Sequence, residues 1–272
     1  MKISRTQTMV ECAVMIALAT VLSLIKVAEL PYGGSVTVAS MLPVILISYR
    51  HGLRWGLGSG LCYAVIQQLL GLSYLSYVSG WQSIVALILL DYILAFVVTG
   101  LGGVFRRAVP GQAGSLVLGT LLVCVLRYIC HVISGCTVWA GLSIPTQAAL
   151  IYSLGYNATY MLPETIVTVL AAFYLGEAVD FTQPIPTRNL HKSIDKTLYG
   201  FYAGAGLAVL AALICDVVLI FPALQNAETG EFDFTGFANV AWLPVSIVSA
   251  ACAVLAAVLV VAGRARAERT NV

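Results

Sequence analysis

Charged side chains are scarce in this chain of 272 residues. Asp, Glu, Lys and Arg together make up 10% of it, and hydrophobic residues make up 60%. Soluble domains carry about 25% charged residues, so the composition excludes an ordinary soluble protein and indicates an integral membrane protein. The net charge of +2 says little by itself. We expect a lipid bilayer around the chain and no nucleic-acid partner.

Several sequence motifs of catalysis and energy coupling are missing. The pattern G-x-x-x-x-G-K-[ST] does not occur, so the chain does not bind a nucleotide through a P-loop. The patterns H-E-x-x-H and G-x-S-x-G are missing too, as are paired glutamates with Glu-x-x-His spacing. A self-contained pump or an intramembrane protease is therefore poorly supported. We expect no enzyme, no metal site and no cofactor.

The cysteines do not form a disulfide or metal-binding pattern. None of the seven belongs to a C-x-x-C pair, and all lie in apolar runs, at positions 12, 62, 124, 130, 136, 215 and 252. Cysteine is among the most buried residue types and behaves as a small hydrophobe. We interpret these cysteines as packing residues.

Long apolar runs dominate what is present. A helix needs about 20 residues to cross a bilayer, and the chain offers eight candidate spans, at residues 8–27, 39–49, 54–73, 82–104, 114–139, 151–176, 198–222 and 239–263. The second run is short and contains Pro43, so we expect a tilted or partial helix there. The first run is too long for a typical signal peptide and lacks a clear cleavage site. The fold class predicted is an all-α integral membrane protein.

The positions of the basic residues support this order of spans. With the N-terminus in the cytoplasm, 12 of the 14 Lys and Arg residues fall on the inner side, and the two left over are Lys26 and Arg127. The outer loops have no Lys or Arg, and the last one contains Glu228, Glu231 and Asp233. This distribution follows the positive-inside rule. It predicts a multi-pass protein with both termini in the cytoplasm.

A change in composition divides the chain after the sixth span. Residues 178–197 form a polar linker that contains Pro184 and Pro186. Residues 198–272 then supply a transmembrane hairpin, rich in Ala, Val, Leu and Gly, and a basic tail. We therefore predict a six-helix domain over residues 1–177, followed by two additional transmembrane helices.

The fifth span carries polar residues where a bilayer disfavours them. Arg127 and His131 are four residues apart, so they share one face of a helix, and Trp139 roughly continues that face. A charge at the centre of a bilayer costs at least about 2.5–3.5 kcal/mol. These residues are therefore expected to face the protein interior and to mark a functional site.

Other polar and aromatic residues fall at similar depth. Asp91 lies in the fourth span, and Tyr152 and Asn157 lie in the sixth. Together with the face of the fifth span they would form a pocket that opens outward. Aromatic walls, a carboxylate and amide groups suit a small, flat, partly cationic molecule, which would be bound by stacking, cation–π attraction and hydrogen bonds.

Each of these residues also has a structural interpretation. Arg127 and Asp91 could form an ion pair between helices, His131 could be a satisfied interior residue, and Trp139 and Tyr152 could belong to an interfacial aromatic belt. Two further patterns consist of small residues. Gly52, Gly56 and Gly60 favour close helix packing. The face of Ala13 and Ala17 could pack inside the bundle or dock a partner.

Several segments, in order, resemble one family. They are Leu30-Pro-Tyr-Gly-Gly-Ser-Val-Thr-Val-Ala-Ser-Met-Leu-Pro43 with Arg50-His-Gly-Leu-Arg-Trp-Gly56, then Asp91-Tyr92, Arg127-x-x-x-His131 with Trp139, and Tyr152 with Asn157 and Tyr160-Met-Leu-Pro-Glu164. Over about residues 5–177 the chain resembles the thiamine-specific S components of energy-coupling factor (ECF) transporters, the ThiT family. The resemblance implies a six-helix S-component-like bundle.

The resemblance also implies a function and a set of site residues. S components of this family bind thiamine and deliver it to a module of a transmembrane coupling protein and two ATPases. By resemblance, Trp139 would stack on the pyrimidine and His131 would lie against the thiazolium. The polar atoms of the ligand would meet Asp91, Tyr152 and Asn157, and Tyr32, Tyr92 and Arg127 complete the expected substrate site. Ala13 and Ala17 would contact the coupling protein.

Two departures leave other functions open. The family pattern has glutamate where this chain has Asp91, and lysine where it has Arg127. The ligand could therefore be another vitamin or a thiamine precursor. A stand-alone, proton-coupled secondary carrier is a further alternative, with Asp91, Glu164 or Asp216 as its proton site.

Overall fold

The computed structural model describes residues 4–30, 33–139, 146–189, 196–224 and 234–270. The chain forms two compact units, Met1–Arg188 and Asn189–Val272. Nearly all of the described secondary structure is helical, which confirms the predicted all-α membrane fold.

The first unit begins with helix α1, Arg5–Leu24. Ser4 caps it, because its hydroxyl accepts from the backbone N–H of Gln7 while the Gln7 side chain accepts from the N–H of Ser4. The first predicted span ran to Val27, and its end is wrong. Residues Lys26–Glu29 instead form strand β1, which pairs antiparallel with β2, Ser35–Thr37. The sequence has only a short signal for this hairpin: Ser35-Val36-Thr37-Val38 alternates polar and apolar residues after Gly33-Gly34.

Two helices follow in quick succession. Helix α2, Leu42–His51, has ten residues and is buried from Leu42 to Arg50. At about 1.5 Å per residue it is too short to cross a bilayer, in agreement with the predicted partial helix. Helix α3, Leu53–Leu70, begins after Gly52, whose φ of +91° favours glycine. Residues Leu72–Tyr77 form a 3₁₀-helix at its far end.

The fourth long helical segment, Trp81–Arg107, is irregular. It consists of α4 (Trp81–Leu87), a π-helical stretch (Ile88–Leu94), α5 (Ala95–Val97) and two short 3₁₀ segments, Val98–Leu101 and Val104–Arg107. Asp91 lies in the middle of the π-helical stretch. Such stretches are rare and occur often at functional sites.

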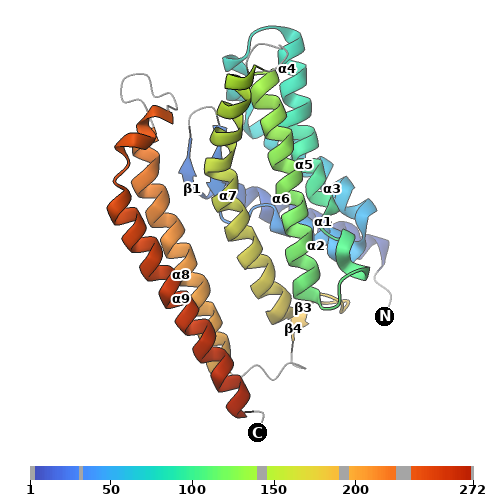
Figure 1. The fold of residues 1–272 in the computed structure, drawn as a ribbon. Coiled ribbons are helices and arrows are strands. Elements are labelled where there is room, and N and C mark those ends of the chain that lie inside the picture. Colours follow the sequence, from blue (N-terminus) through green and yellow to red (C-terminus); the bar gives the residue numbers. More distant parts are fainter. Residues whose placement is uncertain (1–3, 31–32, 140–145, 190–195, 225–233, 271–272) are drawn as a thin grey trace. The chain divides into compact units, whose positions relative to one another are not determined.

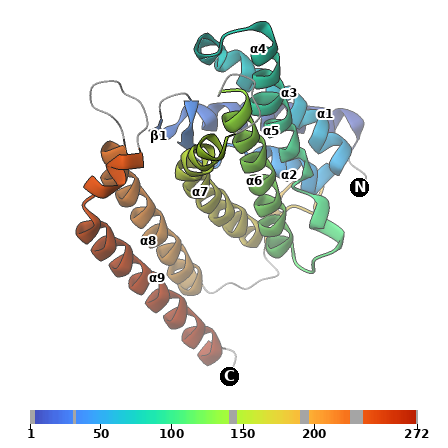
Figure 2. The same ribbon diagram turned by 45° about the horizontal axis from the view of Figure 1, so that its top comes forward.

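Helices α6, Gln112–Thr137, and α7, Gln147–Ala178, complete the bundle. They lie side by side (Figure 1). Helix α6 lies between α7 and the segment that contains α5 (Figure 2). Two short strands, β3 (Val179–Asp180) and β4 (Thr187–Arg188), pair after α7. They lie at the end of this unit opposite to α4 (Figure 1).

Small residues allow close approach between these helices. A side chain at Gly56 would collide with the backbone of Gly100, and one at Gly60 would make a tight contact with backbone atoms of Phe96 and Val97. The close packing predicted for these two glycines is thus confirmed. Gly135 of α6 makes the corresponding close contact with Ser153 of α7.

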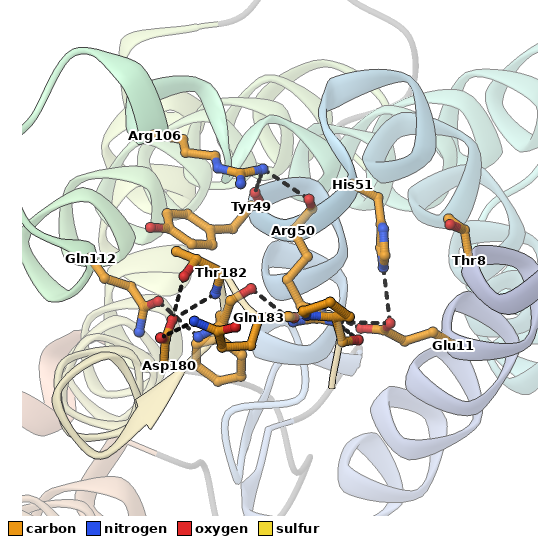
Figure 3. A network of polar contacts seen from close by, with 12 residues as sticks. Thr8, Glu11, Tyr49, Arg50, His51, Arg106, Gln112, Asp180, Thr182 and Gln183 are labelled. Atoms are coloured by element: carbon orange, nitrogen blue, oxygen red, sulfur yellow. Dashed lines mark hydrogen bonds and ion pairs between the residues drawn. The ribbon is translucent and has the colours of Figure 1, made fainter. Parts of the chain in front are cut away.

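A polar network closes the end of the first unit where β3 and β4 lie (Figure 3). The buried guanidinium of Arg50 donates to both carboxylate oxygens of Glu11 in α1, and to the backbone carbonyls of Phe181, Gln183 and Pro184. His51 Nε2 lies 3.1 Å from Glu11 Oε2. The sequence predicted that Arg50 lies in a connection on the cytoplasmic side. In the structure it is an interior residue that joins α1, α2 and the turn between β3 and β4.

The second unit is a helical hairpin. It contains α8 (Lys196–Ile220), two short 3₁₀ segments (Phe221–Leu224 and Phe234–Asn239) and α9 (Trp242–Thr270). Helices α8 and α9 pack along one another. Within the hairpin, the hydroxyl of Ser249 lies 2.8 Å from each carboxylate oxygen of Asp216. This bond gives the carboxylate a partner inside an apolar helix pair.

Six helices in the described chain are long and apolar enough to cross a membrane, which shows a multi-pass membrane protein. They lie at Arg5–Leu24, Trp81–Arg107, Gln112–Thr137, Gln147–Ala178, Gly200–Leu224 and Trp242–Gly263. The two other predicted spans correspond to α2 and α3. Helix α2 is the partial helix expected there, and both the status of α3 as a span and the orientation of the termini stay predictions.

Candidate functional site

The centre of the site is the carboxylate of Asp91. Its Oδ1 lies 2.8 Å from Nδ1 of His131, and its Oδ2 accepts from the Ser134 hydroxyl at 2.6 Å and from Trp139 Nε1 at 3.0 Å. His131 and Ser134 are three residues apart on α6, so both face the π-helical stretch. Three donors from one neighbouring segment thus hold this carboxylate.

His131 presents a second polar atom to the interior. With Nδ1 directed at Asp91, the other ring nitrogen, Nε2, is buried and has no hydrogen-bond partner among the described residues. When Nδ1 carries the proton, Nε2 is an acceptor. The pair therefore offers a ligand a carboxylate and an imidazole nitrogen together.

Trp139 lies two residues beyond the end of α6, where its backbone N–H still donates to the carbonyl of Ser134. The sequence placed it on the helix itself. The Trp139 ring packs with Tyr92 on a cluster of Val78, Leu87 and Val138, and its centroid is 6.5 Å from that of Tyr77. Trp139 is thus both a wall of the site and a hydrogen-bond donor to its carboxylate.

Tyr92 packs on the same cluster as Trp139. Its hydroxyl donates to the carbonyl of Gly71 at 3.3 Å, and a side chain at Gly71 would collide with that hydroxyl. Tyr92 therefore connects the π-helical stretch with the end of α3, and it packs on the same apolar cluster as Trp139.

Helix α7 supplies the opposite side. The buried Asn157 donates to the carbonyls of Ser153, at 2.8 Å, and His131, at 3.4 Å, and accepts from the Tyr160 hydroxyl at 2.6 Å. The ring of Tyr160 meets that of His131 edge to face at 6.2 Å. Asn157 and Tyr160 thus contact His131 from α7.

Tyr152 differs from the other predicted site residues because it is 40% exposed. Its ring stacks on Tyr156, with centroids 6.2 Å apart and planes inclined by 8°. The Tyr156 hydroxyl in turn accepts from the backbone N–H of Gly34. Tyr152 therefore forms the outer layer of an aromatic stack on α7.

Hydrogen bonds to Glu29, the last residue of β1, hold the β1–β2 hairpin in place. Glu29 accepts from Lys26 Nζ at 2.6 Å and from the Tyr74 hydroxyl at 3.0 Å. The bond from Lys26 lowers the pKa of Glu29. Burial, together with the hydrogen bond to Glu29, raises the pKa of Tyr74 to about 12. Tyr74 therefore stays a neutral donor, and the hairpin is joined to the 3₁₀-helix that follows α3.

The predicted ion pair between Arg127 and Asp91 is wrong. Arg127 is buried, with one amino group against the Met41 sulfur and the guanidinium carbon 4.4 Å from the centroid of the Phe96 ring. The reason is geometric. The fourth segment and α6 run antiparallel, so Asp91 meets His131 and Ser134, and Phe96, just over one turn further along, meets Arg127.

The structure thus brings together Asp91, His131, Trp139 and Asn157, and Tyr92 shares the apolar cluster on which Trp139 packs. It separates Arg127 from Asp91, and Tyr32 lies outside the described residues. Sequence reasoning did not select Ser134 or Tyr160 as site residues. Ser134 follows His131 by three residues, so the helical spacing that linked Arg127 to His131 could also have indicated it.

The two other acids in apolar spans have separate surroundings. Asp216 belongs to the second unit and binds Ser249. Glu164 is buried and accepts from the backbone N–H and the hydroxyl of Thr37. Within the first unit Glu164 does not contact Asp91, so these two acids do not form one chain of proton sites among the described residues.

The face of α1 that contains Ala13 and Ala17 is exposed in the first unit. Met9, Val10, Val14 and Leu18 are exposed beside them. Ala13 and Ala17 therefore do not pack inside the bundle, which was one of the two alternatives left open by the sequence.

Comparison with known proteins assigns the family. Residues 9–182 match the family model described as "Thiamine transporter protein (Thia_YuaJ)". The chain belongs to this thiamine transporter family. The thiamine transporter ThiT of Bacillus subtilis (strain 168) is 35% identical over 173 residues, which cover 60% of this chain and 86% of that relative.

Membership in the thiamine transporter family confirms the resemblance found in the sequence motifs. It also confirms that the chain is a membrane transporter and not an enzyme. The matched residues end within the turn between β3 and β4, and all of the site residues described above lie inside them. The hairpin of α8 and α9 lies outside the match.

Proposed function

We propose that this protein binds thiamine between Asp91, His131, Trp139 and the aromatic residues of α7, as the substrate-binding S component of an ECF transporter in the cell membrane. It would deliver the vitamin to a coupling transmembrane protein and two ATPases. The observation that carries the proposal is the set of three donors on Asp91, within the residues that match the thiamine transporter family.

The chemistry of thiamine supports this choice. The molecule joins an aminopyrimidine to a positively charged thiazolium ring. A carboxylate presents about four lone-pair sites, and the protein occupies three at Asp91, so an amino group of the ligand has an acceptor available. The rings of Trp139, Tyr156 and Tyr160 suit stacking and cation–π contact with the two ligand rings.

The partner proposal rests on α1. Ala13 and Ala17 form an exposed small-residue face, and such faces allow another helix to approach closely. With the positive-inside orientation, both termini would lie in the cytoplasm, and the network of Arg50 and Glu11 would lie at the cytoplasmic end. Helix α1 would thus present its docking face next to a rigid base.

A titration of the purified protein with thiamine, followed by quenching of tryptophan fluorescence, tests the ligand. The expected result is saturable quenching by thiamine and far weaker binding of a neutral thiazole fragment. Equal affinity for both would contradict the pocket. Uptake into vesicles tests the energy source: it should require ATP and the coupling module, whereas uptake driven by a proton gradient alone would indicate a secondary carrier.

A further inference from the structure

Glu164 of α7 holds a segment that is 127 residues distant in the chain. Its Oε2 accepts from the backbone N–H of Thr37, and its Oε1 accepts from the Thr37 hydroxyl at 2.7 Å. The same hydroxyl lies 2.8 Å from Oγ of Ser40. The Glu164 residue is 3% exposed and Thr37 is 6% exposed. Both carboxylate oxygens are therefore used, inside the protein, to bind one residue of β2.

The contact belongs to a series along α7. Residues 33–41, here called the connecting segment, follow this helix turn by turn. Gly34 binds the Tyr156 hydroxyl and leaves no room for a side chain beside the Tyr160 ring. Thr37 then meets Glu164, one turn beyond Tyr160. The segment ends at Met41, which contacts Arg127 on α6. Figure 1 shows the β1–β2 hairpin beside α7.

The series runs over the residues that hold the site. Tyr160, which lies under Gly34, donates to Asn157 and packs edge to face on His131. The connecting segment and the proposed substrate pocket therefore share one wall. A displacement of the segment would uncover Tyr156 and Tyr160 at the same time.

A buried carboxylate makes this contact at a cost in the free energy of folding. Burial of an ionised group disfavours folding unless partners compensate for its lost hydration. Glu164 has two hydrogen bonds from Thr37, and Arg127 is near enough to stabilise its charge without a direct ion pair. A buried carboxylate with two such hydrogen bonds suits a place where a segment must adopt one defined position.

We propose that Glu164 is a positioning residue that fixes the connecting segment over the binding pocket and so sets how slowly the bound substrate leaves. The inference rests on the proposed function for the identity of the substrate. It also assigns Glu164 a role that needs hydrogen bonding and not proton transfer. Glutamine can fill that role, because its carbonyl accepts from the Thr37 N–H while its amide donates to the Thr37 oxygen, whose hydrogen turns to Ser40.

Two measurements test the proposal. The first is hydrogen–deuterium exchange of the connecting segment in ligand-free protein, with Glu164→Ala, Thr37→Val, Glu164→Gln and Thr37→Ser. The second is thiamine dissociation, followed by stopped-flow fluorescence for the same variants. Thr120→Val is the matched control, since Thr120 is fully buried and its hydroxyl has no partner among the described residues.

Glu164→Ala and Thr37→Val should speed both exchange and dissociation roughly tenfold or more, because a hydrogen bond to a charged group is lost. Glu164→Gln, Thr37→Ser and the control should stay within about threefold of the wild type. If Glu164→Ala does not fold, Thr37→Val decides alone. Unchanged exchange in a folded Thr37→Val variant would overturn the positioning role, whatever the ligand.

The two proposals fail in different ways. Wild-type protein that does not bind thiamine would contradict the proposed function, while the exchange data would still decide the positioning role. Wild-type protein that binds thiamine and loses it at the same rate in every variant would overturn control of substrate release. Loss of ATP-driven uptake in Glu164→Gln, with exchange and dissociation unchanged, would overturn the assignment of Glu164 to positioning alone.

Discussion

The carboxylate of Asp91 and the imidazole of His131 lie 2.8 Å apart on two antiparallel helical segments. Their side chains are 15% and 11% exposed, respectively. Asp91 therefore has an organised set of donors before any ligand binds. A ligand that meets this carboxylate enters a preformed site and does not need to order its side chain, which favours tight binding.

Asp91→Asn should weaken thiamine binding by roughly 30-fold or more, because the amide group can replace only one of the two carboxylate oxygens as acceptor. Fluorescence titration measures the affinity, and thermal denaturation shows whether the fold survives. Asp216→Asn is the matched control. That carboxylate lies in the second unit and binds Ser249, so its removal should leave thiamine affinity unchanged.

Trp139 should act through both its ring and its N–H. Trp139→Phe keeps an aromatic face but loses the bond to Asp91, and Trp139→Ala loses both. We expect affinity to fall in the order wild type, Phe, Ala, with the melting temperature of the Phe variant near that of the wild type. Trp242→Ala in the second unit is the control. An affinity that is indifferent to Trp139→Ala would identify Trp139 as an interfacial belt residue.

Asp91 and Arg127 should behave as independent residues. They contact different partners, so the stability effects of Asp91→Asn and Arg127→Met should add within about 0.5 kcal/mol. Arg127→Met should instead couple to Glu164→Gln, because removal of the guanidinium leaves the buried Glu164 carboxylate without a nearby positive charge. A double-mutant cycle on thermal or denaturant stability measures both couplings. Rescue of Asp91→Asn by Arg127→Met would contradict the contacts described here.

Arg50→Met should destabilise the first unit by about 3–5 kcal/mol, the usual effect of removing one partner from a buried ion pair. The loss leaves Glu11 and the carbonyls of the β3–β4 turn without their donor. Arg50→Lys should rescue little, since an ammonium group cannot reproduce the planar fork. Arg54→Met is the control: Arg54 is exposed, and its change should stay within about 0.5 kcal/mol.

Ala13→Trp and Ala17→Trp should abolish uptake in cells while purified protein still binds thiamine. The added bulk would prevent close approach of a partner helix to α1. Leu61→Trp, on an exposed position of α3, should leave both properties intact. Normal uptake by both α1 variants would show that this face does not dock the coupling protein.

Much of the site could be predicted because a membrane makes polar residues conspicuous. Asp91, His131 and Asn157 are polar residues inside long apolar runs, and each one lies at the centre of the contacts described above. The sequence did not point to Ser134 or Tyr160 because their polar groups are less conspicuous. Hydroxyl groups are common in membrane helices, so neither residue is conspicuous in a sequence, although both hold the site together.

The sequence by itself determined that this protein lies in a membrane, that it is helical and that it belongs to the thiamine transporter family, since hydrophobic length and ordered motifs are local properties of the chain. Only the tertiary structure decided which residues contact one another. Asp91 meets His131 and not Arg127 because of the register between two antiparallel segments, and Glu164 meets Thr37 across 127 residues. Register and long-range contact depend on how all the helices pack together, and no single stretch of sequence encodes them.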